Sequence, residues 1–157
     1  MIYVLAILIG VTAGLRAVTP LAALAIGGAA GWIYLEGTTF EFLLYAIALW
    51  IFIALAAVEI VNDKLPRTPS RTVPMQFGVR MLAGIFAGAC LAVVPSGETI
   101  TDLVLGGIAG AVGAVVGTLG GARLRAGLAK SFGDDLPAAL TEDVIAIGAA
   151  LLIVYFA

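Results

Sequence analysis

The chain has 157 residues, of which 62% are hydrophobic and 11% charged, and its mean hydropathy is +1.17. A soluble domain carries roughly 25% charged residues, so this composition excludes a water-soluble protein and indicates one polytopic transmembrane domain over residues 1–157. The net charge of −2 argues against a nucleic-acid partner, and without histidine no metal or other cofactor is expected.

Six apolar segments follow one another along the chain. They are residues 2–14, 18–35, 40–61, 75–95, 101–121 and 137–156. The last four are each about 20 residues long, which is enough to cross a hydrocarbon core of about 30 Å. The sequence therefore predicts an all-α membrane protein, built as a compact bundle of about six transmembrane helices. Cys90 lies within the fourth segment and is expected to be a small core residue.

The first two segments are short, and the turn between them contains Gly14, Arg16 and Pro20. Glycine and proline interrupt helices, so we favour a hairpin over one long broken helix through residues 2–35. Helices this short would leave Arg16 several Å below the membrane surface. A cation at that depth costs about 3 kcal/mol unless it is paired or reaches water, so we expect Arg16 to have a carboxylate partner.

The charged residues predict how the chain is oriented. Lysine and arginine gather in the polar stretch 59–74 and in a predicted connection at 121–136, whereas the connections at 33–41 and 95–102 are acidic. By the positive-inside rule the basic connections are cytoplasmic and both termini lie outside. The expected location is a bacterial inner membrane.

Two stretches of the sequence are similar to each other. Leu15-Arg16-Ala17 precedes Pro20, and Leu124-Arg125-Ala126 precedes Pro137 with a longer insert. If the six segments form two halves of three, the halves have opposite orientations, as in transporters with inverted repeats. The similarity indicates either such a repeat or chance matching in a sequence rich in alanine and leucine.

Glycines recur at a spacing of four residues in several segments. They are Gly10 and Gly14, Gly27 and Gly31, Gly84 and Gly88, Gly106 and Gly110, and Gly113, Gly117 and Gly121. Small residues at this spacing allow the backbones of two helices to approach closely. We interpret these ridges as packing surfaces within the chain or, for segment 101–121, as the face of a homodimer.

The predicted inner ends of the helices bring charge into one region, which is a candidate binding site. Its residues are Arg16, Glu59, Asn62, Asp63, Arg67, Arg71, Arg80, Arg125, Glu142 and Asp143. Charged side chains within apolar segments are costly, so they mark functional sites more often than charges elsewhere. We therefore expect a polar pocket that faces the cytoplasm. The alternative is that these charges cap helix ends and reach the membrane surface.

Three hypotheses about function follow. The pocket favours a small transporter or channel, in which Glu59 or Glu142 changes its protonation state. The guanidinium and hydroxyl groups of residues 66–72 suggest instead a protein or enzyme that binds lipid phosphate. The third hypothesis is a non-catalytic scaffold that acts through its glycine ridges. Catalysis is disfavoured because the chain has neither a nucleotide-binding loop nor a histidine base. Membrane lipids, including anionic lipids, are the expected partners.

Four motifs carry a resemblance to a known family. They are Gly14-Leu-Arg-Ala17, Asn62-Asp-Lys-Leu-Pro-Arg-Thr-Pro-Ser-Arg71, Gly117-Thr-Leu-Gly-Gly121 and Pro137-Ala-Ala-Leu-Thr-Glu-Asp143. With them the chain resembles a family of small bacterial integral membrane proteins known as a domain of unknown function. The resemblance covers essentially the whole chain. It implies a compact multi-spanning membrane protein and assigns no catalytic residue.

Overall fold

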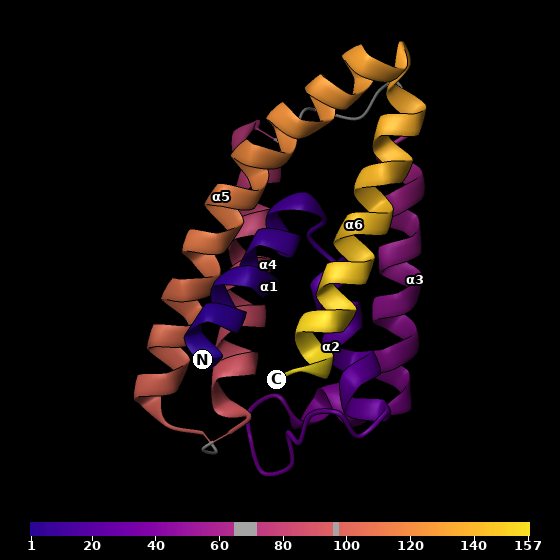
Figure 1. Cartoon of the computed structure of the whole chain (residues 1–157). Helices are drawn as coiled ribbons and strands as arrows, with labels where there is room; N and C mark the ends of the chain where they lie inside the picture. The colour runs from indigo at the N-terminus through magenta and orange to yellow at the C-terminus, as the bar shows by residue number, and fades with distance from the viewer. Residues whose placement is uncertain (65–71, 96–97) are drawn as a thin grey trace.

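The computed structural model describes residues 1–64, 72–95 and 98–157, and within these ranges the chain is helical with no strand. The helices are α1 (Ile2–Leu15), α2 (Thr19–Ala29), α3 (Ala46–Asn62), α4 (Pro74–Val93), α5 (Ile100–Phe132) and α6 (Asp135–Tyr155), with a short 3₁₀ helix, η1 (Glu41–Leu44), before α3. The two termini lie at one end of the bundle, and the connection from α5 to α6 lies at the other end (Figure 1). The predicted all-α class is confirmed.

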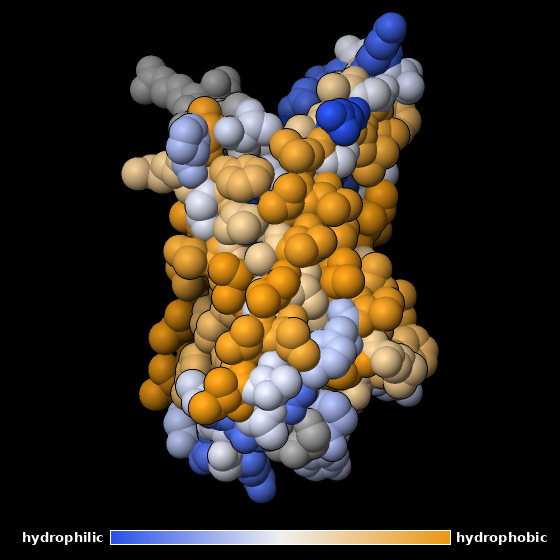
Figure 2. Space-filling model, turned by 90° about the vertical axis from the view of Figure 1, so that its left-hand side faces the viewer, coloured by the Kyte–Doolittle hydropathy of each residue, from blue (hydrophilic) through white to orange (hydrophobic). Residues whose placement is uncertain are grey.

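Three helices, α4, α5 and α6, are long and apolar enough to cross a membrane. Helices α1, α2 and α3 are apolar but shorter, so the prediction of about six transmembrane helices was wrong by this measure. Figure 2 shows apolar side chains over the middle of the molecule and hydrophilic side chains at its two ends. This distribution fits a membrane protein whose polar ends face water on either side.

Several predicted boundaries are corrected by the helices. The predicted segment 18–35 ends as a helix at Ala29, because Gly31 adopts a positive φ of 72° that a helix cannot continue through. The predicted connection at 121–136 was wrong, since α5 runs on to Phe132. Gly133, with φ of 75°, ends α5, and the Asp134 side chain then accepts a hydrogen bond from the Leu136 N–H to start α6.

Helices α1 and α2 form the predicted hairpin. Helix α1 leads from the N-terminus into the bundle, and α2 returns toward the end at which the chain began (Figure 1). At about 1.5 Å per residue, the two helices are about 21 and 17 Å long, so neither crosses a hydrocarbon core of about 30 Å. Their turn, from Arg16 to Val18, therefore lies inside the bundle. Irregular backbone is tolerated at membrane depth where protein surrounds it.

Glycine brings α1, α4 and α5 together. A Cβ atom at Gly110 would overlap the Gly84 carbonyl oxygen, and one at Gly113 would overlap the Ile7 carbonyl oxygen. The helices therefore meet backbone to backbone, as the four-residue spacing predicts. These glycines pack within the chain. The homodimer stays a prediction.

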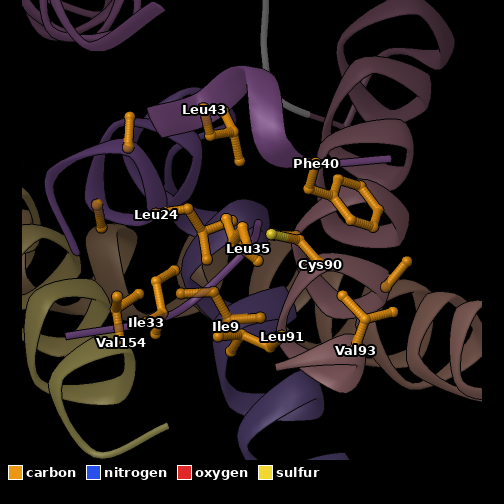
Figure 3. Close-up of a cluster of buried hydrophobic side chains, with 14 of the residues drawn as sticks. Ile9, Leu24, Ile33, Leu35, Phe40, Leu43, Cys90, Leu91, Val93 and Val154 are labelled. Atoms are coloured by element: carbon orange, nitrogen blue, oxygen red, sulfur yellow. The ribbon is translucent and has the colours of Figure 1, made fainter. Parts of the chain in front are cut away.

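The connection between α2 and α3 closes the end of the bundle that carries the termini. Its side chains Ile33, Leu35 and Leu43 are buried among the helices (Figure 3). Cys90 of α4 lies beside Leu35 in the same cluster and is a free, buried thiol, which confirms its predicted place in the core. One end of the bundle is thus apolar inside, which leaves the other end to hold the buried charge.

Candidate functional site

The site begins where α1 ends. The last carbonyl groups of a helix have no partner within the helix and carry partial negative charge. In α1, Arg80 of α4 is the partner of two such carbonyl groups. Its Nη1 donates to the carbonyl oxygens of Gly14 at 3.0 Å and Leu15 at 2.6 Å. The Thr118 hydroxyl of α5 also donates to Gly14, at 3.3 Å. Arg80 and Thr118 are both buried, so the end of α1 is capped by side chains and not by bulk water.

The start of α2 is capped in the opposite sense. The first N–H groups of a helix carry partial positive charge and attract a carboxylate. Glu59, on α3, accepts hydrogen bonds from the N–H groups of Ala17 at 2.7 Å and Val18 at 2.9 Å, one with each oxygen. Pro20 suits the first turn of α2 because it has no N–H to satisfy. Glu59 therefore fixes the turn of the hairpin to α3.

Arg16 lies between these two helix ends and is fully buried. Its Nη2 donates to Asp63 at 2.8 Å and lies 2.5 Å from a carboxylate oxygen of Asp143. The expectation that Arg16 has a carboxylate partner is met by two, one at the end of α3 and one on α6. The Nε and Nη1 atoms of Arg16 have no hydrogen-bond partner within the described part of the chain. A buried donor left in this state is unfavourable, so this guanidinium has room for a further polar contact.

Further charges link α3, α5 and α6 around Arg16. Arg125 of α5 pairs with Asp63 and makes a bidentate pair with Asp135, at 3.0 and 2.6 Å. Lys64 pairs with Asp143 at 2.5 Å. Glu142, which is 1% exposed, lies 3.9 Å from Arg125. We call the following residues the charge network: Arg16, Glu59, Asp63, Lys64, Arg80, Arg125, Asp135, Glu142 and Asp143.

Asp63 is the carboxylate that both Arg16 and Arg125 contact, and it lies outside the three long apolar helices. Burial alone would raise its pKa, because an apolar environment disfavours the charged form. The hydrogen bonds and charges of the two guanidinium groups outweigh burial and lower the pKa of Asp63 below its ordinary value of 3.8. Asp63 is therefore ionised at neutral pH and connects α3 to the turn and to α5.

The structure brings together most of the residues that the sequence nominated. Arg16, Glu59, Asp63, Arg80, Arg125, Glu142 and Asp143 all belong to the charge network. Asn62 is exposed at the end of α3. Arg67 and Arg71 lie outside the described residues.

Sequence reasoning missed two members of the charge network. Lys64 was counted only with the basic stretch 59–74, and Asp135 was not nominated for the site, whereas both form ion pairs. The signal for Lys64 was its place next to Asp63 at the same helix end. The signal for Asp135 depended on the length of α5, which carries Arg125 up to the start of α6. Among the described residues, no group of three or more acidic or cysteine side chains is arranged to hold a metal ion.

The match to a family model can now be set beside this geometry. The model described as "Domain of unknown function (DUF4126)" matches residues 3–157. The chain belongs to that family. No curated protein and no solved structure matches the chain. The DUF4126 match covers the hairpin and the whole charge network, but it assigns no activity, so the function has to be argued from the site.

Proposed function

We propose that the chain is a small membrane transport protein, a transporter or a channel, and that the charge network is its ion or proton site. The observation that carries the proposal is Arg16. This cation is fully buried at the turn of a hairpin that does not cross the membrane, and two of its nitrogen atoms have no partner in the described part of the chain. Most buried side-chain donors in proteins have a hydrogen-bond partner, so these two nitrogen atoms favour a binding role for Arg16 over a purely structural one.

The arrangement of helix ends supports the proposal. Transporters often place their sites where interrupted helices end near the middle of the membrane, because the exposed backbone groups there attract ions. In this chain the carbonyl end of α1 and the N–H end of α2 meet at one turn. Arg80 and Glu59 now occupy these helix ends. An ion that displaced either side chain would find backbone groups ready to bind it.

The balance of charge indicates which ions suit the site. The carboxylates of the charge network suit a proton or a small cation, whereas the two unpartnered nitrogen atoms of Arg16 suit an anion. Glu142 is the first candidate for an ion-binding group, because it is the most buried of these carboxylates. Glu59 is the second candidate, since it holds the N–H groups at the start of α2.

The proposed orientation follows the positive-inside rule. The end that holds the charge network faces the cytoplasm, both termini face outside, and the membrane is a bacterial inner membrane. The basic end of α5 then meets the inner leaflet, where anionic lipids are partners.

Two alternatives remain as predictions. The lipid-phosphate hypothesis rests on Arg67, Ser70 and Arg71, which lie outside the described residues. The scaffold hypothesis rests on glycine ridges, many of which pack within the chain. No observation of the described residues favours either alternative over transport.

A flux assay tests the proposal. The protein is reconstituted into liposomes that contain a pH-sensitive dye, and a potassium gradient with valinomycin sets the membrane potential. The same assay is repeated with sodium, potassium and chloride as the permeant ion. We expect flux above that of empty liposomes for at least one of these ions.

Variants of α5 supply the matched comparison. Arg125→Gln removes a member of the charge network, whereas Arg123→Gln removes an exposed arginine two residues away on the same helix. We expect Arg125→Gln to lower the flux at least tenfold and Arg123→Gln to leave it unchanged, at equal amounts of monodisperse protein. Absence of flux for every ion, or equal flux in both variants, would contradict the proposal.

A further inference from the structure

Two cations in the described ranges of the chain stand apart from the charge network, and both are on α5. They are Arg123 and Lys130, which are exposed and form no ion pair or hydrogen bond with any residue that the structure describes. The other described cations contact carboxylate or carbonyl oxygens of the protein; they are Arg16, Lys64, Arg80 and Arg125. The charges of Arg123 and Lys130 are therefore available to a partner outside the chain.

These two cations lie on one face of α5. A helix turns about 100° per residue, so side chains seven residues apart point in nearly the same direction. Arg125, two residues from Arg123, points to nearly the opposite side of the helix, where it meets Asp63 and Asp135. Arg123 and Lys130 thus point away from the charge network.

The same face of α5 is apolar nearer the start of the helix. Its exposed side chains there precede Arg123 by 18, 11, 7 and 4 residues, and they are Leu105, Val112, Val116 and Leu119. Figure 2 looks at the side of the molecule on which α5 lies in Figure 1, and it shows apolar surface over the middle and hydrophilic side chains toward the upper end. In a membrane the apolar part of this face contacts acyl chains.

The length of α5 places its cations at the level of lipid headgroups. Asp102, in the first turn of α5, accepts a hydrogen bond from the Tyr3 hydroxyl at 2.7 Å, at the end of the bundle that carries the termini. Arg123 lies 21 residues further on, which is about 31 Å along a helix, and the hydrocarbon core is about 30 Å thick. Asp102 and Arg123 therefore bracket the hydrocarbon. Lys130 lies about 10 Å beyond Arg123, and its flexible stem can reach back toward the headgroups.

Two glycines beside Arg123 leave the helix backbone open. Gly120 and Gly127 are three and four residues from Arg123, and a Cβ atom at either would meet nothing within 4 Å. Glycine inside a helix destabilises it relative to alanine, and at Gly110 a neighbouring backbone explains that cost. No described neighbour explains it at Gly120 or Gly127. The open backbone gives a headgroup room to approach the Arg123 guanidinium closely.

We propose that this face of α5 binds one anionic phospholipid. Its phosphate accepts hydrogen bonds from Arg123, whose planar guanidinium matches the geometry of phosphate, and its acyl chains lie along Val116 and Leu119. Lys130 adds a second positive charge, and each such cation at an anionic headgroup strengthens binding about fivefold. The site depends on the depth of α5 in the membrane and not on transport, so it holds or fails independently of the ion site.

Competition between two lipids tests the proposal. The whole protein in mild detergent is mixed with equal amounts of phosphatidylglycerol and phosphatidylcholine that carry the same acyl chains, and the retained lipids are counted by native mass spectrometry. We expect at least fivefold more phosphatidylglycerol than phosphatidylcholine. Excess glycerol 3-phosphate, which has the phosphate without acyl chains, should not displace it. Equal retention of the two lipids, or displacement by glycerol 3-phosphate, would overturn the proposal.

Two substitutions on α5 form a pair matched in net charge. Arg123→Gln removes one positive charge from the site, whereas Thr101→Asp adds one negative charge at an exposed position near the other end of the helix. We expect Arg123→Gln to lower the retention of phosphatidylglycerol at least fivefold, and Thr101→Asp to change it less than twofold. The melting temperature of Arg123→Gln without lipid should stay unchanged, because Arg123 has no partner in the described chain. Equal retention in the two variants would overturn the proposal and leave Arg123 as a solvated charge only.

A second pair tests the open backbone. Gly127→Leu fills the space beside Arg123, whereas Gly148→Leu adds the same side chain on α6, where a Cβ atom also meets nothing within 4 Å. We expect Gly127→Leu to lower the retention of phosphatidylglycerol at least threefold and Gly148→Leu to leave it unchanged. Equal retention in these two variants would overturn the role assigned to the glycines.

Discussion

The two halves of this bundle are held together by different forces. Helices α1, α4 and α5 meet through glycine, with backbone against backbone and no room for a side chain at positions such as Gly110. Helices α2, α3 and α6 meet more loosely, around an apolar slot and under the charge network. The first half is held by close packing, and the second depends on charge.

The difference shows which half is able to change. Close packing between backbones has one good arrangement, because any shift opens a void or makes a clash. Ion pairs can exchange partners, and their strength depends on protonation and on water. Helix α3 has no buried residue, and it is attached to the hairpin turn by Glu59 and Asp63. We therefore expect any working motion in α2, α3 and α6, with the glycine-packed helices as the fixed frame.

The largest effect is expected from removing the buried cation. Arg16→Met keeps an unbranched side chain but leaves Asp63 and Asp143 without the guanidinium they share, which costs about 4 kcal/mol. Thermal unfolding in detergent measures the loss, and hydrogen exchange should place it in α2, α3 and the start of α6. The exposed Arg123→Met serves as the control and should have little effect. Equal losses in the two variants would show that the charge network does not hold this half together.

The glycine-packed half should respond to a single methyl group. Gly110→Ala places a Cβ where the Gly84 carbonyl oxygen lies, so α4 and α5 must separate, at a cost of about 3 kcal/mol. Gly120→Ala, also on α5, meets open space and should stabilise the helix by up to about 1 kcal/mol. Melting temperatures that shift in opposite directions would confirm the difference. A tolerated Gly110→Ala would mean that this half is not closely packed.

A smaller effect is expected for the carboxylate that caps α2. Glu59→Gln keeps one hydrogen-bond acceptor for the N–H groups of Ala17 and Val18 but loses the charge, at a cost of about 1.5 kcal/mol. Glu98→Gln is the matched change at the other end of the bundle, where an exposed carboxylate binds the N–H and hydroxyl of Thr39. Thermal unfolding should show a clearly larger loss for Glu59→Gln. The reverse order would remove Glu59 from its assigned role.

The smallest expected effect is in the pH dependence of stability. The folded-state pKa of Asp63 is lowered below 3.8, so its stabilising contribution is complete above that pH and is lost as the pH falls through the lowered value. The melting temperature of the unsubstituted chain should fall in this acidic range more steeply than that of Asp63→Asn. Parallel curves for the two proteins would show that the ion pairs of Asp63 do not contribute.

Much of the charged half could be predicted from the sequence. A single arginine between two short apolar segments has to be buried, and burial requires a carboxylate partner, which limited the choice to the acidic residues near other helix ends. This reasoning placed Arg16 in one region with Glu59, Asp63, Glu142 and Asp143, and the structure shows that its partners are Asp63 and Asp143. The glycine spacing likewise predicted close helix packing, because few other arrangements use glycine every fourth residue.

Other features depend on the position of whole helices and had no local signal. Glu59 was expected to pair with an arginine, whereas it caps the backbone of α2, a role that depends on where α2 starts. Asp135 joined the charge network because α5 continues past Gly121 as a helix and carries Arg125 to it, and glycine alone did not indicate that. The slot beside Thr19 arises from how three helices diverge, which composition does not encode.

The central claim is that the charge network is a hydrated working site and that the glycine-packed half is its rigid frame. Hydrogen exchange in lipid nanodiscs tests this claim most directly. The amides to compare are those of Ala17 and Val18, which donate to Glu59, and those of α5 around Gly110 and Gly113. We predict that the first pair exchanges at least a hundredfold faster than the second, although Ala17 is as buried as Gly110 and Gly113. Equal and slow exchange at the two places would contradict the claim and would make the charge network a dry structural core.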